Sequence, residues 1–426
     1  MKIRDIVIPN ANNGPNESWE FINYVDTGSC TKNEISHLQK IKRGFYPSRA
    51  KRIVNKNDII ISTVRPNQCH YAIIKEPMEN MVVSTGFTVL TPKENVIPEY
   101  LYFFLTQETI TKRLSILAEG ATTSYPSITP DDILDIEINL PDLDYQKLVV
   151  DVLWPIEEKI ILIKKINTEL ENLAKTIYNY WFVQFDFPNE EGKPYKTSGG
   201  EMVWNEELKR EIPKGWKFDS LKRLFEIQSG YPFESEDYRK KGDYKLITIK
   251  NVQDGFLNTN ETDFIEFLPK NLPDYCKLKL GDLLMSLTGN VGRVCIVTEE
   301  NLLLNQRVGV VNPQNQCLAF TYFTLQSDFI VKTLKKIATG SNQKNLSPIE
   351  AGEEKALLPD ENIMKLFEKK TKPFFDMILK NQRENQELIK LRDFLLPMLM
   401  NGQVKVKSEA KEQLSMAAEP QVKYGK

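Results

Sequence analysis

The chain carries one sequence pattern twice, 218 residues apart. The stretch LPDLDYQKL that begins at Leu140 returns at Leu358 as LPDENIMKL. The same spacing continues beyond both stretches and aligns Pro155 with Pro373, Ile160 with Ile378, Asn167 with Asn385, Glu169 with Glu387, Leu170 with Leu388 and Leu173 with Leu391. Two unrelated amphipathic helices could share leucine periodicity, but periodicity alone would not align the proline or the asparagine. The repeat therefore predicts a tandem duplication.

Further matches extend the duplication over the globular parts. The apolar run NDIIISTV (57–64) matches GDLLMSLT (281–288), and both are typical of buried strands. An aromatic-rich segment that ends at Gly120 matches one that ends at Gly340, so we expect a helix and then a polar loop in each copy. TGNVGRV, from Thr288, predicts a hairpin turn between strands. Short strands mixed with helices indicate a mixed α/β (α+β) fold. The segment 215–243 has no evident counterpart before Trp19.

The segments after each LPD predict long helices. Steps of four and three residues form one apolar seam at Ile156, Ile160, Ile163, Asn167, Leu170, Ala174, Ile177 and Trp181, and its counterpart at Phe374, Ile378, Asn381, Asn385, Leu388, Arg392, Leu395 and Leu399. We expect Pro155 and Pro373 to be the first helical residues after a break. The two helices should pair antiparallel as a coiled coil about a pseudo-two-fold axis. Asn167 and Asn385 would then face each other and fix the register.

These patterns divide the chain into six parts. We expect globular domains at 1–139 and 215–357, spacer helices at 140–185 and 358–402, a connector at 186–214 and a disordered tail at 403–426. A length of 426 residues favours two or three domains. With 41% hydrophobic and 27% charged residues, the composition is that of a globular protein.

Composition also bears on location. Neither a run of about 18 apolar residues nor an apolar signal core near Met1 is present, which predicts a cytoplasmic protein without a membrane span. Five scattered cysteines without C-x-x-C spacing predict reduced thiols.

A search for catalytic motifs finds none. The only histidines, His37 and His70, lack metal-ligand spacing, and no phosphate-binding loop or glycine-rich cofactor loop is present. The Asn/Asp-Pro-Pro-Tyr run of amino-methyltransferases is missing, and no Pro-Asp dipeptide leads into a strand with E-x-K. We therefore predict a protein that recognises a ligand or serves as a scaffold, with no catalytic or metal-ligating residues.

Several polar segments suit DNA. The run KIKRGFYPSRAKR (40–52) holds six basic and no acidic residues, a mixture that suits phosphate neutralisation, although a solvated basic loop would look the same. Arg, Asn and Gln side chains can pair with guanine or adenine edges, and they recur in the loops of both copies. The candidate DNA-binding residues are Lys42, Arg43, Tyr46, Arg49, Arg65, Asn67, Gln68, Ser124 and Tyr125 in the first copy, and Asn290, Arg293, Gln306, Arg307, Asn342, Gln343 and Lys344 in the second.

The chain resembles the specificity subunit of type I restriction–modification systems. The resemblance covers all but the tail, and it is carried by STVRPN from Ser62, VVSTGF from Val82, GATTSYPSI from Gly120, YNYWFVQFDFPNEEGKPYKTSGGEMVWNEEL from Tyr178, IPKGW from Ile212 and the repeated helix after LPD. It implies two target-recognition domains, each of which reads one half of a split double-stranded DNA site, and two spacer helices between them. Individual base contacts do not carry over, because the recognition loops vary within the family.

The resemblance also implies partners. Two methyltransferase subunits would bind S-adenosylmethionine and modify adenine, and two motor-nuclease subunits would use ATP and magnesium. This chain would bind none of these cofactors and would have no enzymatic activity. The alternatives are a nuclease or methyltransferase with an unrecognised active site, and a coiled-coil scaffold without a DNA role.

Overall fold

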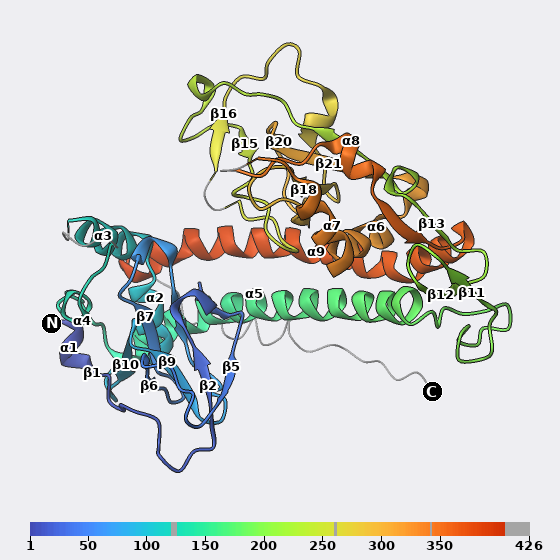
Figure 1. Ribbon diagram of the computed structural model, residues 1–426. Coiled ribbons are helices and arrows are strands. Elements are labelled where there is room, and N and C mark those ends of the chain that lie inside the picture. The colour runs from blue at the N-terminus through green and yellow to red at the C-terminus, as the bar shows by residue number, and fades with distance from the viewer. Residues whose placement is uncertain (121–125, 260–261, 341–342, 405–426) are drawn as a thin grey trace, which may run out of the picture. The chain divides into compact units, whose positions relative to one another are not determined.

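The computed structural model describes residues 1–120, 126–259, 262–340 and 343–404. The chain forms two compact units. Unit 1 comprises Met1–Ile161 together with the C-terminal segment from Leu388, and unit 2 comprises Leu162–Glu387. Two long helices, α5 (Leu143–Tyr178) and α9 (Glu361–Met400), each contribute to both units (Figure 1). The fold is mixed α/β, as predicted from the sequence.

Unit 1 contains two four-stranded sheets. The first is antiparallel, in the order β1 (Val7–Pro9), β10 (Phe87–Pro92), β7 (Ile59–Ser62), β8 (Tyr71–Ile73). The second has the order β5 (Gln39–Lys42), β2 (Phe21–Val25), β9 (Met81–Ser84), β6 (Ala50–Ile53). In the second sheet β2 and β9 are parallel, whereas the other pairs are antiparallel. A short hairpin of β3 (Cys30–Thr31) and β4 (Glu34–Ile35) stands beside them. The β-branched run 59–61 is buried, as expected for a strand covered on both faces.

Helices cover the first sheet of unit 1. They are α1 (Ile3–Ile6), α2 (Pro98–Leu105), α3 (Glu108–Glu119) and α4 (Pro130–Leu134), together with the N-terminal part of α5 and the C-terminal part of α9. Their apolar side chains form one core with β1, β7, β8 and β10, to which α5 contributes Val149 and Leu153 and α9 contributes Leu396 and Leu399. The N-terminal unit therefore depends on residues from the far end of the sequence.

Unit 2 has the same two sheets in the same order. The antiparallel sheet is β14 (Phe225–Ser229), β21 (Val308–Pro313), β18 (Leu283–Ser286), β19 (Val294–Ile296). The second sheet is β16 (Asp263–Ile265), β15 (Tyr244–Ile247), β20 (Leu302–Leu304), β17 (Lys277–Leu278), and again the central pair, β15 and β20, is parallel. Two further strand pairs are β11 (Met202–Asn205) with β12 (Arg210–Pro213) and β13 (Lys217–Ser220) with β22 (Lys355–Leu358).

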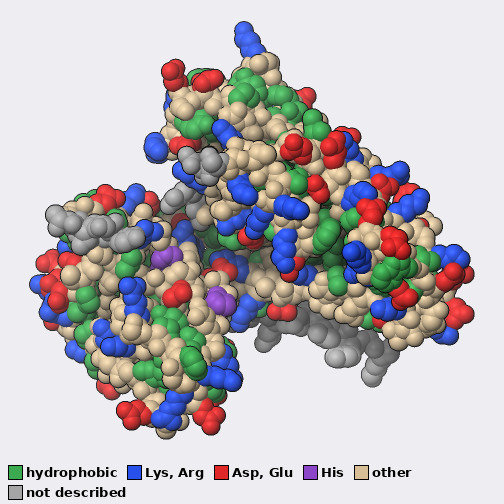
Figure 2. Space-filling model, in the orientation of Figure 1, with side chains coloured by type: hydrophobic (Ala, Val, Ile, Leu, Met, Phe, Trp, Pro, Cys, Tyr) green, Lys and Arg blue, Asp and Glu red, His purple; other side chains and the backbone are tan. Residues whose placement is uncertain are grey.

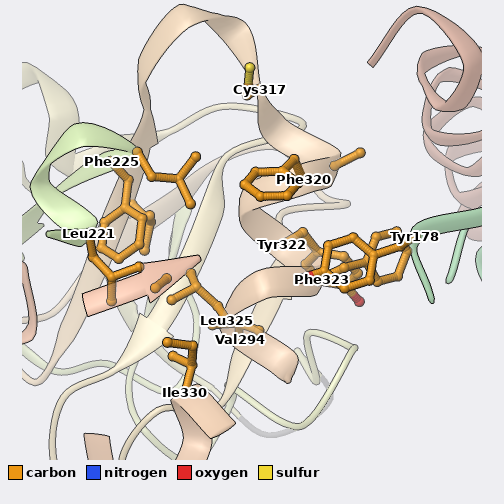
Figure 3. Close-up of a cluster of buried hydrophobic side chains, with 14 of the residues drawn as sticks. Tyr178, Leu221, Phe225, Val294, Cys317, Phe320, Tyr322, Phe323, Leu325 and Ile330 are labelled. Carbon is orange, nitrogen blue, oxygen red and sulfur yellow. The ribbon is translucent and has the colours of Figure 1, made fainter. Parts of the chain in front are cut away.

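The core of unit 2 is rich in aromatic side chains. Its short helices are α6 (Leu318–Gln326), α7 (Asp328–Ile337) and α8 (Pro348–Glu353). Tyr178 of α5 packs against Phe320 and Phe323 of α6, with ring centroids 5.8 and 5.6 Å apart (Figure 3). Glu368 of α9 accepts a hydrogen bond of 2.8 Å from the Phe320 backbone N–H in the first turn of α6. Burial raises the pKa of Glu368 to about 7.

The structure confirms several local predictions and corrects others. The predicted strands at 57–64 and 281–288 are β7 and β18, and TGNVGRV is the hairpin turn between β18 and β19. Each predicted aromatic helix is two helices, α2 with α3 and α6 with α7. The break in the second copy falls at Ser327, whose hydroxyl caps α7 by accepting from Ile330 N–H. The segment 215–243 has a counterpart after all, because β14 occupies the place of β1.

The long helices continue through the two prolines at which a break was predicted. Pro155 lies inside α5, which starts at Leu143, and Pro373 lies inside α9, which starts at Glu361. A proline removes one intrahelical hydrogen bond and strains the preceding turn. Packing of the surrounding turns stabilises the helix across it, since most helix stability in proteins comes from such packing. The prediction of a break before each proline is therefore wrong. Of the predicted tail, residues 405–426 lie outside the described residues.

Within each unit, α5 and α9 run in opposite directions. In unit 2, Tyr178 packs on Phe367, with ring centroids 6.1 Å apart, and Asn167 meets Asn381, so rising numbers on α5 match falling numbers on α9. In unit 1, Tyr145 donates a hydrogen bond to the Leu399 carbonyl, whereas the later α5 residue Glu157 pairs with the earlier α9 residue Arg392. All predicted seam positions are buried or half-buried. The heptad phase predicted from the sequence thus agrees with burial.

The polar seam residues pair one turn away from the predicted register. Asn381 Nδ2 donates to Asn167 Oδ1 over 2.8 Å, and no hydrogen bond between Asn167 and Asn385 is found among the described residues. The repeat relates Asn167 to Asn385 and Ile163 to Asn381, so the same pairing would set Asn385 opposite Ile163, which cannot donate a hydrogen bond. In agreement, Asn385 is 3% exposed and its Oδ1 has no hydrogen-bond partner within the described residues. Within the described residues, the structure therefore pairs Asn167 with Asn381 and not with Asn385.

Replacing Asn385 should therefore stabilise the protein. Asn385→Leu removes a buried acceptor without a partner, and we expect it to raise the free energy of unfolding by about 1 kcal/mol. Asn381→Leu, the matched variant, leaves Asn167 Oδ1 without its donor and should lower the free energy of unfolding by roughly 1–3 kcal/mol. Denaturant titration of both variants measures the difference. A loss of stability in Asn385→Leu equal to that in Asn381→Leu would show that Asn385 has a partner.

Candidate nucleic-acid interface

Three loops of unit 1 meet at one edge of its sheets. They are the β7–β8 turn, the β9–β10 turn and the loop that follows α3. Backbone hydrogen bonds join them: Thr63 N–H donates to the Gly86 carbonyl over 2.8 Å, and Arg65 N–H donates to the Pro126 carbonyl over 2.9 Å. Val64 and Ser127 also form a β-bridge. Because these bonds are between main-chain atoms, they hold the loops together whatever side chains the loops carry.

The same three loops meet in unit 2. Leu287 N–H donates to the Arg307 carbonyl over 3.0 Å, which joins the β18–β19 turn to the β20–β21 turn. Gly289 N–H donates to the Lys344 carbonyl over 2.9 Å, and a bridge between Thr288 and Asn345 joins the loop after α7. Each unit therefore presents one composite surface of three loops, built on the same strands. We call it the loop edge of that unit.

The β7–β8 turn is the most constrained of these loops. It contains a short 3-10 helix, Pro66–Gln68, flanked by Arg65 (φ +48°) and Cys69 (φ +55°), both left-handed. Non-glycine residues rarely adopt this conformation, so the surrounding contacts must impose it. Helix α3 packs against the turn, and Pro66 is buried beneath it. Arg65, Asn67 and Gln68 are exposed as a result.

The fold places the residues of the predicted basic run (40–52) at two opposite ends of one sheet. Arg49 lies at the loop edge, since its carbonyl accepts from Thr85 N–H in the β9–β10 turn over 2.8 Å. Lys42 pairs with Phe21 at the opposite end of the same sheet, and Arg43 follows it. Tyr46 is half-buried between them and donates a hydrogen bond to the Trp19 carbonyl over 3.1 Å. The structure therefore brings Arg49 together with Arg65, Asn67 and Gln68, but not Lys42 or Arg43.

In unit 2 the predicted residues fall into two groups. Asn290, Gln306 and Gln343 are exposed in the three loops, and Arg307, also exposed, donates to Asn345 Oδ1 over 3.2 Å. Two others are engaged within the unit. Arg293 donates to Gln253 Oε1 over 2.7 Å and lies 3.4 Å from an Asp254 carboxylate oxygen. Lys344 Nζ donates to the Lys335 carbonyl near the end of α7. Ser124, Tyr125 and Asn342 lie outside the described residues.

Sequence reasoning missed one exposed cation near this surface. Lys250 follows β15, and its neighbour Ile249 lies beside Gly289 of the β18–β19 turn, 3.5 Å from the position of a β-carbon there. The corresponding loop of unit 1, after β2, packs on the β9–β10 turn through Thr27 and Gly86. Alignment of β2 with β15 would have found this loop, but the two strands share little sequence.

A buried carboxylate supports the loop edge of unit 1 from below. Glu157 of α5 is 1% exposed and accepts hydrogen bonds from Tyr102 of α2 (3.1 Å) and Asn33 of the β3–β4 hairpin (3.2 Å). Arg392 of α9 donates to its other oxygen over 2.8 Å. Burial would lower the pKa of Arg392, but the adjacent Glu157 and Asp393 carboxylates hold that pKa above its usual value. Neighbouring Lys32 N–H in turn donates to the Cys69 carbonyl of the β7–β8 turn over 2.9 Å.

Unit 2 contains a related contact with fewer members. Tyr322 of α6, at the position of Tyr102, donates to Glu171 of α5 over 2.6 Å. Burial, then the Glu171 charge, raises the pKa of Tyr322. Gly255 takes the place of Asn33, and a β-carbon there would lie 3.6 Å from the tyrosine oxygen. Each of the two buried tyrosines thus donates a hydrogen bond to a carboxylate of α5, and a hairpin turn covers each pair.

The surface charge is mixed. Basic and acidic side chains are interspersed over the face in Figure 2, in keeping with the formal charge of −2. Within the described ranges, no group of three or more His, Cys, Asp or Glu side chains could hold a metal ion. No helix in that part of the chain is long and apolar enough to cross a membrane. Polar loops presented on the same scaffold in both units define a protein of the class that recognises a ligand through its loops.

Comparison with known proteins shows to which protein family the chain belongs. The family described as type I restriction modification DNA specificity domain matches residues 1–172 and 213–349, more than half of the chain. The chain belongs to this family. The HindI type I restriction enzyme specificity subunit of Haemophilus influenzae is 26% identical, over 89% of this chain and 94% of that protein. The MjaIX specificity subunit of Methanocaldococcus jannaschii is 28% identical, over 83% and 79%.

A solved structure agrees with the fold. The crystal structure of a type I restriction-modification S subunit from M. genitalium covers 94% of this chain and 95% of its own, with a TM-score of 0.50 and 16% sequence identity. By its family and its specificity-subunit relatives, the chain is the non-catalytic, DNA-recognising subunit of a restriction–modification system, which implies DNA and the methyltransferase and restriction subunits as partners. An unrecognised nuclease or methyltransferase site is not favoured, and neither is a scaffold without a DNA role.

The division of the basic run leads to a test by salt dependence. If Arg49 and Arg65 contact phosphates, Arg49→Gln and Arg65→Gln should each reduce the slope of log K against log salt by roughly 0.9. Lys42→Gln and Arg43→Gln are the matched controls from the opposite end of the sheet, and we expect their slopes to be unchanged. Titration of DNA binding at several salt concentrations measures all four. An equal loss at Arg43 would extend the interface over both ends, as the sequence alone predicted.

Proposed function

We propose that this chain reads a split DNA target, with the loop edge of unit 1 on one half-site and that of unit 2 on the other. The observation that carries the proposal is the identical strand order of the two units, with the same three loops joined by the same main-chain hydrogen bonds. Residues 1–139 and 215–357 are then duplicated target-recognition domains. Because the loop sequences differ, the two half-sites should differ in sequence as well.

In this proposal α5 and α9 form the spacer between the half-sites. They pair as an antiparallel coiled coil over residues 140–185 and 358–402, and 186–214 connect one repeat to the next. The antiparallel contacts within each unit support this arrangement. A pseudo-two-fold axis would then relate the two readers.

The partner subunits supply the chemistry. Two methyltransferase subunits with S-adenosylmethionine would modify adenine, and two motor-nuclease subunits would use ATP and magnesium. This chain would bring them to the target in the cytoplasm and bind none of their cofactors. The lack of catalytic motifs in the sequence agrees with this division of labour.

Exchange of one domain tests the split-target proposal. Replacing residues 1–139 by the same region of a relative should change one half of the methylated motif and leave the other half intact, because each unit folds around its own cores. Exchange of residues 215–357 is the matched control and should change the opposite half. Methylome sequencing of cells that express each variant reads the outcome directly. A change in both halves after either exchange would show that the units form one composite reading surface.

A second test concerns the spacer. Helices rise about 1.5 Å per residue and DNA about 3.4 Å per base pair, so a four-residue insertion corresponds to nearly two base pairs. One extra turn near Thr168 and another near Gln386 should therefore require a longer gap between unchanged half-sites. Methylome sequencing again gives the gap. If the preferred gap stays the same, the helices do not set the spacing.

A further inference from the structure

The ring of His70 lies between two oxygen atoms in the β7–β8 turn. Its Nδ1 is 2.5 Å from the Cys30 backbone carbonyl oxygen, and its Nε2 is 3.0 Å from Gln68 Oε1. Thr31 Oγ1 also lies 3.1 Å from Nδ1. Cys30 belongs to the β3–β4 hairpin, and Gln68 ends the short 3-10 helix of the turn. The histidine therefore connects the hairpin to an exposed glutamine of the loop edge.

Hydrogen-bond chemistry decides which ring nitrogen carries the proton. A backbone carbonyl oxygen can only accept, so Nδ1 must be the protonated nitrogen. Burial lowers the pKa of His70 below its usual value and so favours the neutral ring. Nε2 of a neutral ring protonated at Nδ1 can only accept. The two ends of an amide are assigned from their hydrogen bonds, so beside a neutral ring the Gln68 amide flips and presents its NH2 group to Nε2 in place of Oε1.

This orientation leaves a defined pair of groups on the outside. One N–H of the Gln68 amide is held by His70, so Oε1 and the second N–H remain side by side and face outwards. An acceptor next to a donor matches the N6 amino group and N7 of adenine in the major groove. Guanine offers two acceptors on that edge and does not match the pair.

We propose that His70 is a positioning residue that orients the Gln68 amide to read one adenine in the half-site bound by unit 1. The inference deepens the proposed function and rests on it. The left-handed residues on either side of Pro66–Gln68 and the α3 helix packed against the turn hold the glutamine backbone in place. The side-chain torsions of Gln68 remain free to rotate, and the contact with His70 restricts them.

Unit 2 has no histidine at the corresponding position. Its β18–β19 turn carries Arg293 at the place of His70, and that side chain is engaged with Gln253 and Asp254. Substitutions of His70 should therefore alter one half-site only. His37, an exposed histidine of unit 1 that is not part of the turn, gives a matched control variant.

The test uses the full chain assembled with its methyltransferase subunits and a DNA library randomised over both half-sites. Selection by binding, followed by sequencing, gives the base preference at every position. For the wild type we expect one position of the unit 1 half-site to prefer adenine by roughly five- to 150-fold, the range of a bidentate contact. Gln68→Ala should abolish the preference at that position and leave all others unchanged. His70→Phe should weaken it, and His37→Phe should not affect it.

A double variant separates positioning from a general structural role. If His70 acts through Gln68, then His70→Phe should have no further effect on base preference in the Gln68→Ala background. A further change there, or a Gln68→Ala variant with every preference intact, would overturn the inference while specific DNA binding stands. A wild-type complex without any sequence preference would instead refute the proposed function. Gln68 is exposed, so Gln68→Ala keeps the inference testable even if His70→Phe does not fold.

Discussion

A carboxylate buried on helix α5 organises the N-terminal unit. An unpaired charge in that position would be strongly unfavourable, and Glu157 avoids this cost through Arg392, Tyr102 and Asn33. Those three partners come from α9, α2 and the β3–β4 hairpin, so one group sets the mutual positions of a long helix, the globular core and the hairpin beside the reading turn. Loss of any donor leaves part of the charge uncompensated. The exposed side chains of the loops take no part in these buried contacts, so they could be replaced without disturbing them.

The loop edges divide recognition into two physical tasks. Phosphate contacts by arginine and lysine supply affinity that is the same for every sequence, whereas amide and guanidinium groups read base edges. A formal charge of −2 means that the chain has no general attraction to DNA, so its cations must act locally. Main-chain hydrogen bonds between the loops provide the rigidity that base reading requires, and they place no demand on loop sequence.

Much of this architecture could be predicted from the sequence, because repetition and periodicity are local patterns. The matched LPD segments predicted two long helices, and the buried seam positions agree with the heptad phase. The pairing of Asn167 with Asn381 could not be predicted, since the offset of 218 relates the helices to each other but does not set their stagger. Tertiary contacts also explain the candidate residues that the fold separates: the run at 40–52 crosses a sheet, and Arg293 and Lys344 find partners inside unit 2.

The composition of unit 1 has a consequence for biosynthesis. A ribosome delivers Glu157, Tyr102 and Asn33 well before Arg392, which is encoded near the end of the chain. Domains generally fold in the order in which they are synthesised. Unit 1 cannot complete its core in that order, because Glu157 stays without Arg392 until α9 has been made. The first unit to emerge is thus the last to be completed. In a nascent or prematurely terminated chain, the core of unit 1 would be incomplete. Chaperones or proteases would then bind such a chain before it could reach DNA.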